Sequence, residues 1–137
     1  MTDDVRDLRV HVARPVAEVH AFASAPANLP RWAPGLGRAV RRDGDDWFVE
    51  QPDGWARVRF TAPDEVGVLD HDVLTASGDT VHVGLRAVPA DGGCDVLFTL
   101  RRPPGASDEE LERDAALVAA DLERLRQVVE SEDPSGA

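Results

Sequence analysis

The sequence predicts an α+β fold in which an antiparallel sheet of six to seven strands wraps around one long C-terminal helix. Two turn signals, Ser77-Gly78 and Asp91-Gly92, separate short apolar runs and indicate hairpins that join antiparallel strands. After the last run, Val96–Leu100, a Pro-Pro-Gly break is followed by a long amphipathic pattern that Ser107 opens. A sheet that holds a single helix in this way often leaves a cavity between the two.

The chain opens with a strand and then one or two short helices. Leu8, Val10 and Val12 alternate with polar residues, which is typical of a half-buried strand. Pro15 suits a first helical position, and the spacing that follows predicts a helix over about 15–24. The stretch 26–37 is rich in Pro and Gly and is expected to be a loop or a broken second helix, with Trp32 as its only large side chain.

The pattern of residues 39–101 then predicts a series of short strands. The stretch 39–41 is a weak strand signal, while 47–51 and 55–61 flank the turn Asp53-Gly54. Strands over 68–74, 81–88 and 96–101 follow, each joined to the next by a short connection. Tight turns between consecutive strands predict an antiparallel meander.

The last helix has a clear start and one apolar stripe. Ser107 and Glu110 form a capping box, in which the Ser107 hydroxyl accepts from the amide of Glu110. The stripe consists of Leu111, Ala115, Val118, Leu122, Leu125 and Val129. The small residues Ala115 and Ala119 would leave room between helix and sheet, although simple close packing would produce the same pattern.

Composition limits the classes of function. We expect residues 1–131 to form one domain and 132–137 a disordered tail. A net charge of -11 argues against nucleic-acid and anionic-membrane partners. The acidic start and the lack of any long apolar run favour a cytoplasmic protein, and the residue bias suggests a bacterial genome. The lone Cys94 has no basic neighbour in sequence, so it is expected to be inert.

Turn geometry predicts which residues share a face of the sheet. A two-residue turn at Asp91-Gly92 sets Leu85 opposite Phe98, and a two-residue turn at Ser77-Gly78 sets Asp72 opposite Val83. The Asp53-Gly54 turn sets Trp47 opposite Phe60, facing inward.

The connection 63–67 leaves two registers open. One, which we favour, keeps Asp70 and Asp72 inside the sheet. The other shifts by one residue, pairs the aspartates with Arg57 and Arg59 outside, and turns His71 inward. An inward carboxylate would be desolvated, its pKa would rise, and it could act as an acid, a base or a polar anchor. An outward ladder would be only structural.

The chain resembles the SRPBCC superfamily, which includes START-like lipid-binding domains and aromatic polyketide cyclases. Three stretches carry the resemblance: Leu29–Pro34, Gly67–His71, and Val96–Leu100 followed by Pro104–Glu110. The resemblance implies a helix-grip fold and a deep pocket between sheet and helix. Members share no common catalytic set, so it implies no residue roles beyond Trp32, which lies in the loop that usually covers the pocket mouth.

The sequence therefore predicts a protein that binds a small hydrophobic or aromatic molecule as a monomer or homodimer. We expect no cofactor and no metal, because the four histidines do not converge and no metal motif is present. The alternatives are a polyketide cyclase- or dehydratase-like enzyme with Asp70 or His71 as acid–base group, and a co-chaperone-like interaction module. The expected ligand-binding residues are Trp32, Trp47, Val58, Phe60, Asp72, Val83, Leu85, Phe98, Ala115, Val118, Ala119 and Leu122.

Overall fold

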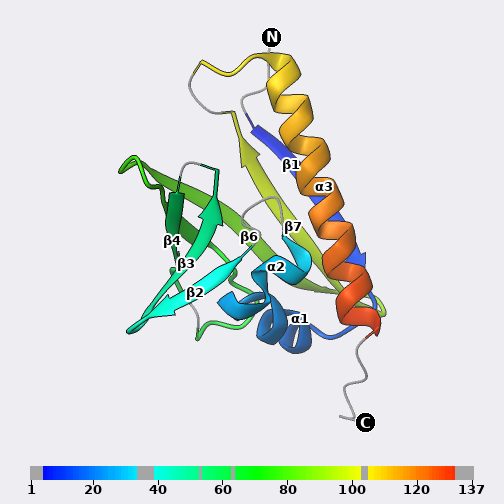
Figure 1. Ribbon diagram of the computed structural model, residues 1–137. Helices are drawn as coiled ribbons and strands as arrows, with labels where there is room; N and C mark the ends of the chain where they lie inside the picture. Colours follow the sequence, from blue (N-terminus) through cyan, green and yellow to red (C-terminus); the bar gives the residue numbers. More distant parts are fainter. Residues whose placement is uncertain (1–4, 34–38, 53, 63, 103–104, 132–137) are drawn as a thin grey trace.

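The computed structural model describes residues 5–33, 39–52, 54–62, 64–102 and 105–131 (Figure 1). Within these residues, seven strands form one antiparallel sheet in the order β1-β7-β6-β5-β4-β3-β2. The strands are β1 (Val5–Val12), β2 (Val40–Asp43), β3 (Asp46–Gln51), β4 (Gly54–Phe60), β5 (His71–Leu74), β6 (Thr80–Ala90) and β7 (Gly93–Arg101). The helices are α1 (Val16–Ala23), the short 3₁₀ turn η1 (Pro26–Asn28), α2 (Leu29–Trp32) and α3 (Asp108–Ser131).

This arrangement confirms the predicted α+β helix-grip class. The long helix α3 lies along the sheet beside β1 and β7, and α1 and α2 sit near its C-terminal half (Figure 1). The broken second helix expected over 26–37 is η1 followed by α2. The expected tail, 132–137, lies outside the described residues.

Helix α3 begins and packs as its sequence pattern predicts. The amide of Glu110 donates to the Ser107 hydroxyl at 3.1 Å, which is the expected cap. Leu111, Ala115, Leu122, Leu125 and Val129 are buried and Val118 is partly buried, so the stripe faces the sheet. Burial of these apolar side chains holds the helix against the sheet.

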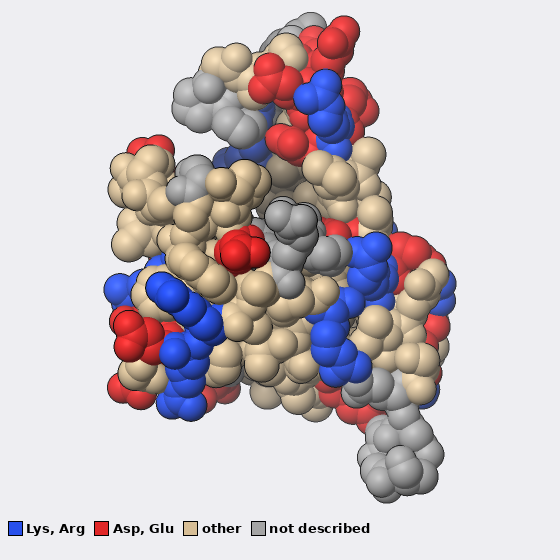
Figure 2. Space-filling model, in the orientation of Figure 1, with Lys and Arg blue, Asp and Glu red and all other residues tan. Residues whose placement is uncertain are grey.

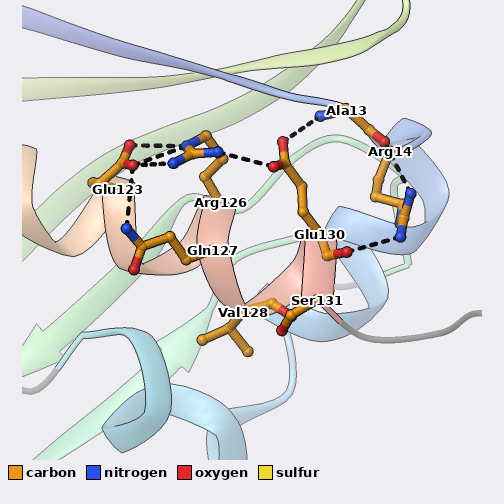
Figure 3. Close-up of polar contacts among 8 residues, drawn as sticks. All are labelled: Ala13, Arg14, Glu123, Arg126, Gln127, Val128, Glu130 and Ser131. Carbon is orange, nitrogen blue, oxygen red and sulfur yellow. Dashed lines mark hydrogen bonds and ion pairs between the residues drawn. The ribbon is translucent and has the colours of Figure 1, made fainter.

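Polar contacts fasten the C-terminal end of α3 to the start of the fold (Figure 3). The Glu130 carboxylate accepts from the Ala13 amide at 2.8 Å, and the Arg14 guanidinium donates to the Glu130 carbonyl at 2.8 Å. Arg126 bridges Glu123 and Glu130 on the helix itself. This end of the helix is therefore fixed on both side-chain and backbone atoms, where β1 passes into α1.

The hairpin registers agree with the predictions in one case and differ in two. Leu85 lies opposite Phe98, as the Asp91-Gly92 turn predicted. Across β3 and β4, Trp47 lies opposite Val58 rather than Phe60. This shift is two residues, so it changes the partners and keeps Trp47 and Val58 on the same face.

The prediction of a two-residue turn at Ser77-Gly78 is wrong. The Thr75 amide donates to the Asp79 carbonyl at 2.8 Å, and the Thr75 hydroxyl accepts from the Asp79 amide at 3.1 Å. These bonds close a loop one residue longer than predicted, with Gly78 at φ +94°. Asp72 consequently lies opposite His82 instead of Val83, and every side chain of β5 changes face relative to the prediction.

Candidate functional site

A cavity of about 230 Å³ lies between the sheet and the N-terminal half of α3. Figure 2 shows a hollow on this face of the molecule, between the upper part of α3 and the strands on the left. The lining side chains come from α2, β5, β6, β7 and α3. They are Trp32, Ala33, His71, Val83, Phe98, Leu100, Asp114, Leu117, Val118, Asp121 and Leu122.

The wall of the cavity is mainly apolar because part of the hydrophobic pattern remains uncovered. Val83, Phe98 and Leu100 are only half-buried on strands whose other inward residues, such as Leu85 and Val96, are fully buried. On α3, Leu117 is 54% exposed although it is a large apolar residue. Incompletely covered apolar side chains beside a concavity are typical of a small-molecule site.

Helix α2 places Trp32 against this wall. Leu29 and Trp32 are one helical turn apart and both are buried, and the Ala33 amide donates to the Leu29 carbonyl at 2.7 Å. Trp32 is only 3% exposed, yet its indole Nε1–H has no hydrogen-bond partner among the described residues. A buried donor without a hydrogen-bond partner is uncommon in folded proteins.

His71 is the polar group on the sheet side of the cavity. It pairs with Phe60 across β4 and β5, packs its ring 5.2 Å from the Phe60 ring, and is 3% exposed. Its Nδ1 lies 3.0 Å from the Leu69 carbonyl, so Nδ1 carries the proton and Nε2 is the acceptor in the neutral ring. Burial lowers the pKa of His71, so the neutral form predominates near pH 7.

The favoured expectation that Asp70 and Asp72 face inward is wrong. Arg59, not Phe60 or Val58, lies opposite Asp72, and Asp72 accepts from the His82 ring at 2.7 Å. The physical reason is the one-residue difference in register, which the longer loop at Ser77-Gly78 imposes on β5 and β6. His71 faces inward, as in the alternative register, but the strand pairs differ from that register by two residues: Arg59 lies opposite Asp72 and Arg57 lies opposite Leu74.

Asp70 has a structural environment on the outer side of the sheet. It accepts from the Leu85 amide at 3.0 Å and from the Arg86 guanidinium at 3.2 and 3.0 Å. The Arg86 contact lowers the pKa of Asp70, with burial opposing it and the Leu85 amide adding to it. A carboxylate held ionised by three hydrogen bonds is poorly suited to move protons near neutral pH.

Two carboxylates on α3 line the cavity and were missed by the sequence analysis. Asp114 and Asp121 are seven residues apart, so they lie on one side of the helix next to the apolar stripe. Burial raises the pKa of Asp121 to about 6, while Arg124 at 3.6 Å opposes that rise. The seven-residue spacing flanking Val118 was the available signal, but an acidic helix face is normally solvated.

The other expected residues lie in three different places. Trp47, Val58 and Phe60 line a second hollow of about 300 Å³ together with Ser24, Pro26, Asp45, Asp46, Arg57 and Arg59. Leu85 and Ala115 are buried in the packed interior, and Ala119 is exposed on α3. The structure therefore brings Trp32, His71, Val83, Phe98, Val118 and Leu122 together at one cavity.

Among the described residues, no group of three or more His, Cys, Asp or Glu side chains is placed to hold a metal ion. No helix in the described part of the chain is long and apolar enough to cross a membrane.

The sequence matches a known protein family, and the fold resembles those of several solved structures. Residues 7–130 match the family model described as polyketide cyclase / dehydrase and lipid transport. No curated protein matches the chain.

Solved structures of similar fold share little sequence with it. DynU16, from the dynemicin biosynthetic locus, is 22% identical with a TM-score of 0.67; the match covers 98% of this chain and 50% of DynU16. This chain thus spans half the length of DynU16. CV1439 from Chromobacterium violaceum is 12% identical with a TM-score of 0.69, covering 95% of this chain and 100% of CV1439. The Aha1 dimer from Colwellia psychrerythraea is 11% identical with a TM-score of 0.71, covering 93% and 96%. At these identities the likeness establishes the fold alone.

Proposed function

Because the chain belongs to the polyketide cyclase / dehydrase and lipid transport family, of the SRPBCC type, we propose that it binds a small apolar or aromatic molecule in the cavity beneath α3. The observation that carries this proposal is the combination of an apolar wall with a few buried polar groups. Small-molecule sites usually have this composition, in which apolar contact supplies affinity and polar groups fix orientation.

Each side of the cavity would contribute differently to the ligand. Phe98, Val83 and Leu122 offer apolar contact from the sheet and the helix. The Trp32 indole N–H would donate to a ligand oxygen, and His71 Nε2 would accept from a ligand hydroxyl or amine. A volume of about 230 Å³ suits a compound of one to three aromatic rings rather than a long-chain lipid.

The test is binding of N-phenyl-1-naphthylamine, a neutral probe that becomes fluorescent in an apolar site. Val118 lines the cavity and its neighbour Ala119 is exposed, so Val118→Trp fills the cavity while Ala119→Trp adds the same ring outside it. We expect the wild type and Ala119→Trp to bind the probe and Val118→Trp to lose at least tenfold in affinity. Absence of binding to the wild type, or equal binding by both variants, would overturn the proposal.

A second candidate is a cyclase- or dehydratase-like enzyme, which the position of His71 and Asp121 on one cavity favours. Neutral His71 could take a proton through Nε2, and Asp121, with a pKa of about 6, could return one near neutral pH. The test is aldol cyclisation of an aryl 1,5-diketone, followed by mass spectrometry. Loss of rate in His71→Gln with unchanged affinity for the naphthylamine probe would support the enzyme, and an equal rate would exclude His71 as its base.

A further inference from the structure

The cavity is lined by acidic side chains and by no basic side chain other than His71, among the described residues. Both ionisable groups on the α3 side are carboxylates, Asp114 and Asp121, and no Arg is among the described residues that line the cavity. The chain contains no lysine at all, and its net charge is -11. On the sheet side, His71 is neutral and presents an acceptor. A ligand in this cavity therefore meets two carboxylates on the α3 side and a neutral hydrogen-bond acceptor on the sheet side.

Asp114 lines the cavity but has no hydrogen-bond or ion-pair partner among the described residues. It is half-buried. Three other carboxylates of the same helix form ion pairs: Glu112 with Arg6, Asp108 with Arg102, and Glu123 with Arg126. A half-buried carboxylate with no partner has free acceptor capacity directed at solvent or at a ligand.

The second carboxylate is only partly compensated. Asp121 is 20% exposed at its side chain, and Arg124 approaches it at 3.6 Å from one turn away on the helix. Arg124 is itself 45% exposed and does not line the cavity. A cation placed inside the cavity would face Asp121 and Asp114 in a setting less hydrated than open solvent, where attraction between charges is stronger.

Trp32 gives a second, independent observation at the same cavity. Its side chain is 97% buried, and its indole N–H has no hydrogen-bond partner among the described residues, which leaves a buried donor unsatisfied. Acidic side chains also gather along the N-terminal half of α3, beside the hollow in Figure 2.

We propose that the cavity selects a small apolar or aromatic amine, with its ammonium group toward Asp114 and Asp121 and a neutral oxygen toward Trp32, and that it rejects carboxylates such as fatty acids. This inference rests on the proposed binding function and adds the chemical class of the ligand to it. A carboxylate ligand would be repelled by both aspartates and would find no cationic side chain among the described lining residues.

The test uses three naphthalenes that differ in one substituent: 2-naphthylmethylamine, 2-naphthylmethanol and 2-naphthoic acid. Each displaces N-phenyl-1-naphthylamine from the full chain at pH 7.5, so the cavity and the ring system are common to all. We expect the amine to bind about tenfold more tightly than the alcohol, and the acid to bind at least tenfold more weakly. Asp114→Asn with Asp121→Asn should remove the advantage of the amine, while Glu109→Gln, on an exposed position of the same helix, should keep it.

The outcomes separate the two proposals. If the naphthylamine probe binds and the three compounds compete equally, the amine preference is overturned and the binding function stands. If the acid competes best, the charge argument is overturned in the same way. If the probe does not bind the wild type, the binding function itself is overturned.

Discussion

Replacement of Asp121 by Asn should stabilise the protein at neutral pH and have little effect in acid. The folded-state pKa of this carboxyl is raised from 3.8 to about 6, mainly because burial disfavours its charged form. A raised carboxyl pKa means that the folded state takes up a proton more readily than the unfolded chain. Stability therefore increases as the pH falls from about 6 to about 4, and above pH 7 the protein carries the full cost of the buried charge.

The size of the effect follows from that shift. About two pKa units, at about 1.4 kcal/mol each, set a ceiling of about 3 kcal/mol. The side chain is 20% exposed and water screens part of its charge, so we expect Asp121→Asn to gain about 1–2 kcal/mol at pH 7.5. That gain corresponds to roughly 4–8 °C in Tm for a chain of this length.

Urea denaturation of both proteins at pH 7.5, 6 and 4.5 measures the difference directly. The advantage of the Asn variant should shrink steadily toward the acid end, because protonated Asp121 and Asn are then alike in charge. Glu109→Gln, which removes the same charge from an exposed position of α3, should show no such trend. An Asn variant that is less stable at pH 7.5, or a gain that does not change with pH, would refute the reasoning.

Three other changes test separate parts of the structure. Asp70→Asn should destabilise the protein by about 1–2 kcal/mol at pH 7, because it breaks the Arg86 contact that lowers the Asp70 pKa. The difference should vanish in urea titrations as the pH falls through that lowered pKa, and unchanged probe binding would separate this role from the cavity. Trp32→Phe should keep the fold but weaken binding of 2-naphthylmethanol about threefold to tenfold in a fluorescence titration. Trp55→Phe, which lies outside the cavity, should leave that affinity unchanged. Equal affinities of the wild type and Trp32→Phe would contradict a hydrogen bond from the indole to the ligand. Gly67→Ala should cost about 1–3 kcal/mol in urea unfolding, since Gly67 has φ +93° and a new Cβ would lie 2.7 Å from the Ala87 carbonyl; a neutral result would rule out that strain.

The sequence carried enough information for the fold because its strongest signals are local. The cap at Ser107 and the stripe from Leu111 to Val129 depend only on helical spacing, and both are confirmed. The Asp91-Gly92 turn likewise predicted the pairing of Leu85 with Phe98. Each of these features is determined within a few neighbouring residues, so no long-range packing was needed to infer it.

The candidate site was harder to predict than the fold, because a register shift of one residue moves every side chain of a strand to the other face of the sheet. The loop at Ser77-Gly78 is one residue longer than predicted, since the Thr75 hydroxyl caps it. As a result, His71 faces inward and Asp70 and Asp72 face outward. Asp121 was missed for a different reason. An acidic residue beside an apolar stripe is solvated in most helices, and only the incomplete packing above Phe98 brings it to a cavity wall.

The central claim, that the space beneath α3 is a ligand site, is tested most directly by methyl NMR of protein labelled at valine and leucine. Titration with N-phenyl-1-naphthylamine should move the methyl signals of Val83, Leu100, Leu117, Val118 and Leu122, which line the cavity. The signals of Leu74 and Val88, exposed elsewhere on the sheet, should stay in place. Unmoved cavity methyls, or shifts confined to Leu74 and Val88, would contradict the account.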